Sequence, residues 1–309
     1  MVYKGLATDM FSYEPDCYPE IDITIEPTLW QRPEDLAIAL SGMEAWIVRN
    51  MSKVTPELLA AAPDLKVVGR LGVGLDNVDL EAAKAAGVAV VYSPQANALS
   101  VAEYCLGQLL NLFRNLVRAD VSTRVGRWDR SGFTGREISG STIGIIGYGN
   151  SGAAFAQICT ALGARVLVHT RRPYTVRAPH EAMSLHNLLE ISDAVSLHLP
   201  LTSQTDGLVD AAFLSRMKSG AVLINASRGE IVQETDLIQA LQSGELAGAA
   251  LDVRGQEPPE TGTLEELPQV VLSPHIAAFT QQAQERVTKT VIADVIAVLN
   301  GEIPACPAF

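Results

Sequence analysis

The sequence predicts an α/β fold built of two doubly wound parallel sheets. Short apolar runs alternate with helical patterns along the 309 residues, and strands that alternate with helices form parallel sheets covered on both faces. A glycine-rich motif lies near the middle of the chain, so a sizeable segment precedes the domain that this motif opens. With 48% hydrophobic residues the chain can bury two cores, since one domain per ~100–200 residues is usual.

The first domain is predicted from residues 1–96. Helical patterns lie near Pro33–Leu40, Thr55–Ala62 and Asp79–Ala86. One long, mostly apolar helix over Ser100–Leu116 then leads into the second domain. The candidate strands are Val2–Ala7, Ile21–Ile25, Ala45–Val48, Lys66–Gly69 and Val88–Tyr92.

The second domain repeats the strand–helix alternation. Its last helical pattern, Gln281–Leu299, ends at Asn300-Gly301, which is a typical C-cap, and its apolar stripe could return the chain to the first domain. We therefore predict a discontinuous first domain over 1–98 and 287–309, a second domain over 99–286, and a cleft at the carboxyl ends of the two sheets. The strands expected are Thr142–Ile146, Arg165–His169, Ala194–Leu199, Ala221–Ala226, Ala247–Asp252 and Val270–Ser273.

The central motif is Gly147-Tyr148-Gly149-Asn150-Ser151-Gly152, a G-x-G-x-x-G pattern between a predicted strand and a helix over Ser151–Leu162. Glycines in this pattern allow the tight turn, the close approach of backbone to a pyrophosphate, and the packing of helix on strand. The helix N-terminus offers N–H groups to phosphates. The motif predicts a dinucleotide-binding domain of the Rossmann type, the alternative being an ordinary strand-turn-helix.

The end of the next strand bears on the choice of cofactor. An acid there would accept hydrogen bonds from the 2′-hydroxyl of NAD, but this chain has Thr170-Arg171-Arg172. Two arginines favour a 2′-phosphate. We therefore predict NADP(H) as the preferred cofactor, with NAD(H) possible, and a solvated loop as the alternative role of the arginines.

Three side chains that follow predicted strands have the chemistry for hydride transfer to a 2-oxo acid. His275 follows an apolar strand, and a protonated imidazole can donate to a forming alkoxide. Glu257 follows another strand, and a carboxylate bonded to an imidazole favours its protonated form. Arg228 follows a third, and a guanidinium can hold a carboxylate with two hydrogen bonds. Each of these three residues could instead have an ordinary structural role. All three follow strands of one predicted sheet, and this convergence favours the catalytic role.

The first domain offers basic and backbone groups for an anion. Arg49 and Arg70 end neighbouring strands, and the segment Leu71-Gly72-Val73-Gly74 exposes N–H groups that could bind a carboxylate. Two arginines at strand ends of an acidic chain suggest a second anion on the substrate. Surface solubility is the alternative.

Composition excludes several classes of partner. A net charge of −12 argues against nucleic acid and anionic membrane. Four scattered cysteines without C-x-x-C spacing suggest neither a disulfide framework nor a zinc site, and no 18-residue apolar span or signal-like N-terminus occurs. We expect a cytoplasmic protein without a metal.

These motifs together resemble the D-isomer-specific 2-hydroxyacid dehydrogenases, nearest to their 3-phosphoglycerate dehydrogenase branch. The resemblance is carried by V-R-N-M-S-K-V-T (48–55), G-R-L-G-V-G-L-D-N-V-D (69–79), N-A-L-S-V-A-E (97–103), the glycine motif, N-A-S-R-G (225–229), D-V-R-G-Q-E-P-P (252–259) and S-P-H-I-A (273–277). It implies a Rossmann cofactor domain inserted into a flavodoxin-like substrate domain, and a homodimer through the cofactor domain with the segment around Trp128 in the contact.

The resemblance also implies roles for single residues. Arg228 binds the substrate carboxylate, and His275 is the acid/base paired with Glu257. Val73 and Gly74 are backbone donors to the carboxylate, and we add Asn97 as a substrate contact. Val101, Pro200 and Thr205 line the cofactor site, and Asp252 lies near the nicotinamide amide; we add His198 and Ala226 as cofactor contacts.

Several positions depart from the family pattern. Thr170 stands where an NAD-binding Asp is usual, Ala96 and Ala277 replace usual glycines, and Gln233 replaces a common Asp. The chain stops at Phe309, so the C-terminal regulatory domain of longer phosphoglycerate dehydrogenases is expected to be absent.

The function we expect is hydride transfer between NADP(H) and a small 2-oxo/2-hydroxy acid that carries a second anionic group such as phosphate, phosphonate or sulfonate. The alternative within this class is a glyoxylate or hydroxypyruvate reductase. A nucleotide-sensing binding protein is the alternative of another class, and the complete set of Arg228, Glu257 and His275 argues against it. Formate or phosphite oxidation on the same scaffold is a further rival.

Overall fold

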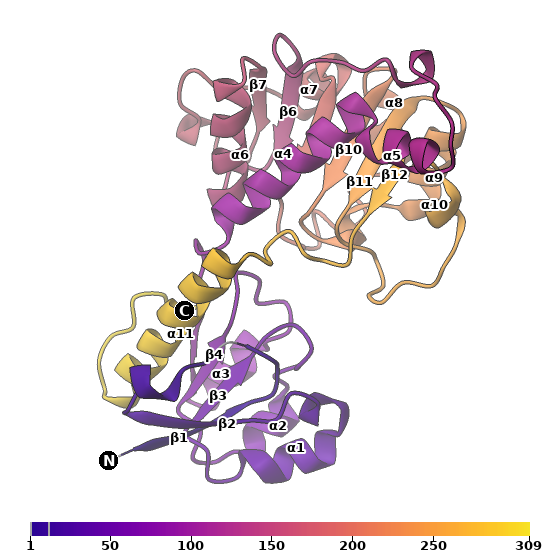
Figure 1. Ribbon diagram of the computed structural model, residues 1–309. Coiled ribbons are helices and arrows are strands. Elements are labelled where there is room, and N and C mark those ends of the chain that lie inside the picture. The colour runs from indigo at the N-terminus through magenta and orange to yellow at the C-terminus, as the bar shows by residue number, and fades with distance from the viewer. Residues whose placement is uncertain (1, 12) are drawn as a thin grey trace. The chain divides into compact units, whose positions relative to one another are not determined.

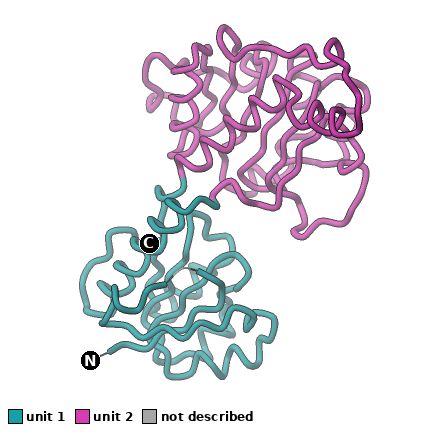
Figure 2. Tube along the Cα trace, in the orientation of Figure 1, with its two compact units in different colours: residues 1–97, 279–309 teal, residues 98–278 magenta. Residues whose placement is uncertain are grey.

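The computed structural model describes residues 2–11 and 13–309 and divides the chain into two compact units. Unit 1 consists of residues 1–97 and 279–309, and unit 2 consists of residues 98–278 (Figure 2). The division thus falls after residues 97 and 278, where the sequence placed it after 98 and 286. Helix α11 therefore lies wholly in unit 1 (Figure 1).

Unit 1 is built on a five-stranded sheet in the order β2-β1-β3-β4-β5, and every pair is parallel. This order, with one reversal beside the first strand, is the flavodoxin-like one. The strands are β1 Tyr3–Ala7, β2 Ile21–Ile25, β3 Ala45–Val48, β4 Val67–Arg70 and β5 Ala89–Val91.

Alternate residues of β3 bury opposite faces of this sheet. Trp46 and Val48 pack with residues of α1–α3, whereas Ala45 and Ile47 pack with α11. This two-residue period explains why both faces are covered by helices. The helices are α1 Pro33–Leu40, α2 Pro56–Ala60, α3 Leu80–Ala85 and α11 Gln281–Leu299, with short 3₁₀ turns at η1 Pro15–Cys17 and η2 Leu29–Gln31.

Unit 2 has a seven-stranded sheet in the order β12-β11-β10-β9-β6-β7-β8, again parallel throughout. Counted from β6, this is the Rossmann order extended by one strand at the β12 edge. The predicted fold class is therefore confirmed. The strands are β6 Thr142–Ile146, β7 Arg165–His169, β8 Glu181–Ala182, β9 Ala194–Leu197, β10 Ala221–Asn225, β11 Leu246–Leu251 and β12 Val270–Leu272.

Helices cover both faces of this second sheet as well. Ile143 and Ile145 of β6 pack with α4 and α6, whereas Ile146 packs in the cluster that α7, α8 and α9 share. The helices are α4 Ala98–Arg114, α5 Leu116–Arg124, α6 Asn150–Ala161, α7 Leu185–Ile191, α8 Ala211–Arg216, α9 Glu234–Gln242 and α10 Thr263–Glu266, with 3₁₀ turns at η3 Ser131–Phe133, η4 Pro173–Thr175 and η5 Gly229–Ile231.

The helix predicted over Ser100–Leu116 is wrong at its C-terminal end. Helix α4 ends at Arg114, and α5 begins at Leu116. Asn115 between them has a φ of 54°, a left-handed conformation that asparagine tolerates better than most residues. The chain therefore turns there and starts a second helix. Among the residues that the structure describes, no helix is long and apolar enough to cross a membrane.

Candidate active site

His275 and Glu257 are in direct contact in unit 2. The ring nitrogen Nδ1 of His275 lies 2.8 Å from Oε2 of Glu257. His275 follows β12 and Glu257 lies in the loop after β11. Since β11 and β12 are parallel neighbours, their carboxyl ends meet at one edge of the sheet (Figure 1).

The charge of Glu257 suits this contact. Burial raises the pKa of its carboxyl, but the hydrogen bond and charge of His275 outweigh that effect, and the net pKa is lowered. The positive charge of Arg228 acts in the same direction, so all three sequence-predicted residues come together. An ionised carboxylate on Nδ1 orients the ring and leaves Nε2 as the nitrogen that can act on a substrate.

The backbone at His275 is held in an unusual conformation by Asp252. His275 has a φ of 55°, in the left-handed region that non-glycine residues seldom adopt. The buried carboxylate of Asp252 accepts hydrogen bonds from Ser273 Oγ (2.6 Å), Ile276 N (2.9 Å) and Ala277 N (2.7 Å). Its backbone carbonyl accepts one from His275 N at 2.7 Å. Asp252 therefore shapes the whole turn that presents the imidazole.

Tyr104 of α4 extends this network and was not predicted from the sequence. Its hydroxyl lies 2.5 Å from Ser273 Oγ, which in turn donates to Asp252. Burial raises the pKa of the Tyr104 phenol to about 12, so it stays neutral. No local signal marks this residue, because it reads as one more position on an apolar helix.

Arg254 fixes the loop that carries Glu257, and the sequence did not single it out either. Its guanidinium binds both carboxylate oxygens of Glu234, with Nε–Oε1 at 2.9 Å and Nη2–Oε2 at 2.8 Å, and it also contacts Glu265. Its backbone N–H donates to Glu257 Oε1 at 3.2 Å. A paired, 11% exposed arginine of this kind restrains its loop strongly.

The loop of Arg228 packs directly against that of Arg254. A Cβ atom added at Gly229 would lie 1.9 Å from the carbonyl carbon of Arg254, so only glycine allows this approach. The backbone carbonyl of Arg228 accepts a hydrogen bond from Asn225 Nδ2 at 2.9 Å. These contacts place Arg228 beside Glu257 although 29 positions separate them in the numbering of the chain.

The glycine motif forms a cradle that fits a pyrophosphate. Gly147 has a φ of 98°, and a Cβ there would lie 2.0 Å from the carbonyl oxygen of His198. A Cβ at Gly152 would lie 2.3 Å from the carbonyl oxygen of Gly147, whereas the space beside Gly149 is open. Gly149 is also the N-cap of α6, so the positive end of that helix meets the open space. Asn150 and Ser151 begin the helix.

His198 lies beneath this cradle. Its ring is hydrogen-bonded to Ser196 Oγ (3.0 Å) and to Ser151 Oγ (3.3 Å). Burial lowers its pKa to about 4, so the ring is neutral and supports the glycine turn from within. Of the other residues expected around a cofactor, Val101 is buried in α4, Ala226 packs beside the same core, and Thr205 donates to the carbonyl of Pro200 at 2.7 Å.

The segment Thr170-Arg171-Arg172 follows β7, where the sequence placed it. Thr170 Oγ1 accepts a hydrogen bond from Arg172 N at 3.3 Å, and both arginines are exposed. They lie at the same edge of the sheet as the glycine motif, because β6 and β7 are paired in parallel. Their exposure leaves them accessible to a ligand.

In unit 1, Arg49 directly follows β3, and Arg70 is the last residue of β4, the strand paired with β3. Arg49 Nη1 donates to the carbonyl of Met10 (3.2 Å), and the guanidinium lies 4.9 Å from the centre of the Phe279 ring. Burial lowers its pKa, although the charge of Asp9 opposes that shift. Arg70 contacts the carbonyl of Leu71 at 3.3 Å.

The remaining predicted substrate contacts follow Arg70 in the chain. Gly72 has a φ of 149°, a backbone conformation that residues with a Cβ rarely adopt, so the turn before Val73 and Gly74 favours glycine. Asn97 is the last residue of unit 1 before α4.

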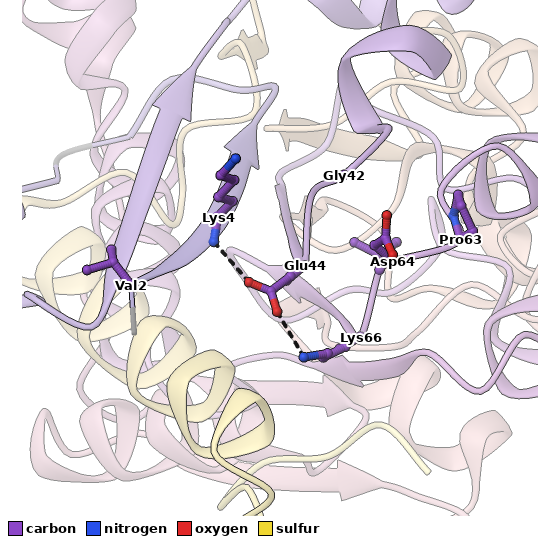
Figure 3. A pocket seen from close by; sticks show the side chains of 8 residues that line it. Val2, Lys4, Gly42, Glu44, Pro63, Asp64 and Lys66 are labelled. Carbon is purple, nitrogen blue, oxygen red and sulfur yellow. Dashed lines mark hydrogen bonds and ion pairs between the residues drawn. The ribbon is translucent and has the colours of Figure 1, made fainter.

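A polar recess of about 510 Å³ lies elsewhere in unit 1 (Figure 3). The residues that line it lie where β1, β3 and β4 begin, at the edge of the sheet opposite to Arg49 and Arg70. Glu44 there accepts hydrogen bonds from Lys66 Nζ (2.9 Å) and Lys4 N (3.3 Å), as Figure 3 shows. Ligands of α/β sheets bind at the carboxyl ends of strands, so this recess is not the predicted site.

Comparison with known proteins identifies the family. Residues 106–277, more than half of the chain, match the family model described as D-isomer specific 2-hydroxyacid dehydrogenase, NAD binding domain. The D-3-phosphoglycerate dehydrogenase of Mycobacterium leprae (strain TN) is 43% identical over 270 residues, which are 86% of this chain and 51% of that protein. The chain spans about half the length of the curated relatives it matches.

Solved structures agree with this result. The TT0316 protein from Thermus thermophilus is 33% identical, with a TM-score of 0.93 over 99% of this chain and 100% of that one. A NAD-dependent formate dehydrogenase from Staphylococcus aureus, solved in complex with NAD, is 30% identical, with a TM-score of 0.85 over 97% and 96% of the two chains. The chain belongs to the D-isomer-specific 2-hydroxyacid dehydrogenase family, and the predicted resemblance is confirmed.

The buried carboxylate at position 252 yields a prediction about stability. In Asp252→Asn, the new NH₂ group faces at least one backbone N–H of residues 276–277, which leaves a buried donor unsatisfied. We expect a loss of ~1–3 kcal/mol in the free energy of unfolding, measured by urea titration. Asp206→Asn removes the same charge from an exposed loop and should change stability little. Equal effects of the two substitutions would contradict the role given to Asp252.

Proposed function

We propose that this chain is a dehydrogenase that interconverts a small 2-oxo acid and its 2-hydroxy acid, with NADP(H) as the preferred cofactor. The observation that carries the proposal is the contact of His275 with an ionised Glu257 beside Arg228. These three groups provide a proton donor, its orienting carboxylate and a carboxylate-binding cation.

The reaction divides among these residues as follows. A bound nicotinamide supplies or accepts the hydride. In reduction, Arg228 holds the substrate carboxylate, and Nε2 of the protonated His275 donates its proton to the carbonyl oxygen as that oxygen becomes a hydroxyl. Glu257 stabilises the imidazolium before the transfer. In oxidation, the neutral ring takes the hydroxyl proton back.

The preference for NADP(H) is supported by the end of β7. Thr170 lacks the carboxylate that would bind a 2′-hydroxyl, and the exposed Arg171 and Arg172 suit a 2′-phosphate. The formate dehydrogenase among the similar structures was solved with NAD, so the proposal for this chain rests on its own residues.

The substrate class is proposed from Arg49 and Arg70. Both are basic groups at the carboxyl ends of neighbouring strands in a chain of net charge −12. These two guanidinium groups would bind a second anionic group on the substrate, such as a phosphate, phosphonate or sulfonate. Glyoxylate and hydroxypyruvate lack that group and are the alternative substrates.

The assembly we propose is a homodimer through unit 2. An apolar face of α5 and the turn after it is exposed, and Trp128 beyond it is 82% exposed. Solvent-exposed apolar clusters of this kind usually mark an interface. The exposed apolar residues are Leu116, Val117, Val121, Val125 and Trp128.

The location we propose is the cytoplasm. All four cysteines are free thiols, and Cys105 and Cys159 are buried. Free thiols are usual in a reducing compartment.

The proposed activity is tested with a spectrophotometric panel of 2-oxo acids, each assayed with NADPH and with NADH. We expect kcat/KM to be at least about tenfold higher with NADPH, since a single charge-assisted hydrogen bond contributes ~1.5–3 kcal/mol. A preference for NADH would overturn the cofactor assignment. Binding of either cofactor without turnover of any acid would favour a nucleotide-sensing protein, and oxidation of formate or phosphite would favour the other chemistry.

The role of Glu257 predicts a loss of turnover when its charge is removed. In Glu257→Gln the ionised carboxylate that orients the His275 ring is gone, and we expect kcat for reduction to fall about tenfold or more, because the proton donor is no longer held on Nδ1. Glu260→Gln, in the same loop, removes a charge from an exposed side chain and serves as the control. An unchanged kcat in Glu257→Gln would exclude the proposed pairing.

Arg49 separates the two substrate classes. We expect Arg49→Gln to raise KM for phosphohydroxypyruvate about tenfold or more, and to change KM for glyoxylate about twofold, because glyoxylate has no second anion. Arg32→Gln removes an exposed arginine of unit 1 and should leave both values unchanged. Equal losses for both acids in Arg49→Gln would show that Arg49 does not bind a second anion.

A further inference from the structure

The loop from Pro173 to His180 is fastened to the glycine motif. The hydroxyl of Tyr148, the second residue of that motif, lies 2.7 Å from Nδ1 of His180. The two rings also meet edge to face, with centres 5.8 Å apart. The loop thus joins the end of β7 to the start of α6 by a contact between side chains 32 residues apart.

His180 makes this contact as a neutral ring. Burial lowers its pKa, while a hydrogen bond with the backbone of Ala156 opposes that shift. A neutral imidazole has one donor and one acceptor. The hydrogen bond with the Ala156 backbone uses the donor, and Nδ1 accepts from the Tyr148 hydroxyl, so His180 ties the loop both to α6 and to the glycine motif.

Arg177 is carried by this fastened loop and is itself held in place. Its Nη1 donates to the carbonyls of Tyr174 and, at 3.4 Å, Val176, and its own carbonyl accepts from His180 N at 3.0 Å. The side chain is exposed. Its charge acts on the Tyr148 phenol, whose pKa burial raises and Arg177 lowers. Arg177 therefore lies close enough to the glycine motif for its charge to act on Tyr148.

The charge of this segment is strongly basic in an acidic chain. Between residues 165 and 181 there are four arginines and a single acid, Glu181. Arg165 binds both oxygens of that acid, at 2.8 and 2.7 Å. The charges of Arg171, Arg172 and Arg177 are therefore not offset by an acid of the segment.

We propose that the Tyr148–His180 hydrogen bond latches the 173–180 loop so that Arg177 joins Arg171 and Arg172 in binding the 2′-phosphate of NADP(H). Tyr148 and His180 are positioning residues, and Arg177 determines specificity. A phosphate monoester carries close to two charges and three acceptor oxygens, which three cations around it can satisfy. This inference rests on the proposed preference for NADP(H).

The test is a binding measurement that does not need turnover. Adenosine 2′,5′-bisphosphate and AMP, which differ only in the 2′-phosphate, are titrated separately into the full chain by calorimetry. We expect Arg177→Gln to weaken binding of the bisphosphate about tenfold and to change binding of AMP less than about twofold. Arg216→Gln, an exposed arginine on α8, removes the same charge and should alter neither affinity.

The latch is tested by Tyr148→Phe and His180→Phe, which remove the hydrogen bond and keep an aromatic ring. Each should weaken bisphosphate binding several-fold, and neither should weaken it further when combined with Arg177→Gln. Full additivity in the double variants, with Tm values unchanged, would overturn the latch. Unchanged bisphosphate affinity in Arg177→Gln would overturn the role of Arg177.

Binding to the unaltered protein tests the proposed preference for NADP(H) separately from the role of Arg177. Tighter binding of the bisphosphate than of AMP supports the NADP(H) assignment, whatever the effect of Arg177→Gln. Equal or weaker binding of the bisphosphate overturns that assignment, and the inference fails with it.

Discussion

The candidate active site depends on the buried carboxylate of Asp252. Three hydrogen bonds from residues 273–277 end on its two oxygens, and its carbonyl accepts the His275 N–H. Because β11 and β12 run in parallel side by side, a carboxylate at the end of one strand can organise the turn after the other. The left-handed backbone at His275 and the direction of its ring follow from this turn.

Further side chains hold the loops of the candidate active site in place, although they are not themselves proposed to act on the substrate. Tyr104 holds Ser273, and Arg254 ties the loop of Glu257 to Glu234 and Glu265. Gly229 allows the loop of Arg228 to lie against that of Arg254. A catalytic group must be held within a fraction of an ångström, and such surrounding contacts provide that precision. They also explain why a half-exposed pair such as His275 and Glu257 has a defined geometry.

Electrostatics place a second constraint on the molecule. With a net charge of −12, the field of the whole chain repels anionic ligands. Binding must come from short-range contacts, and the basic side chains concerned follow strands at the carboxyl edges of the sheets. Within residues 165–181 the single acid, Glu181, is bound by Arg165, and the segment carries a net positive charge.

The sequence by itself determined the features that are local in the chain. Strand and helix periods, the glycine motif, and the placement of Arg228, Glu257 and His275 after apolar strands could all be predicted, because each is encoded within a few neighbouring residues. Strand β8 was missed because two exposed residues show no alternation. The break at Asn115 was missed because the apolar pattern continues past it.

Only the tertiary structure decided which partners support these residues. Tyr104 meets Ser273 across 169 positions, and Arg254 meets Glu234 across 20. Tyr148 and His180 pair across 32. Such contacts depend on how the strands are ordered in the sheet and on the conformation of the loops between them, and neither leaves a periodic trace in the sequence. The residue types of the site could therefore be predicted from the sequence. The hydrogen bonds and ion pairs that hold these residues in place form only when the sheet is assembled.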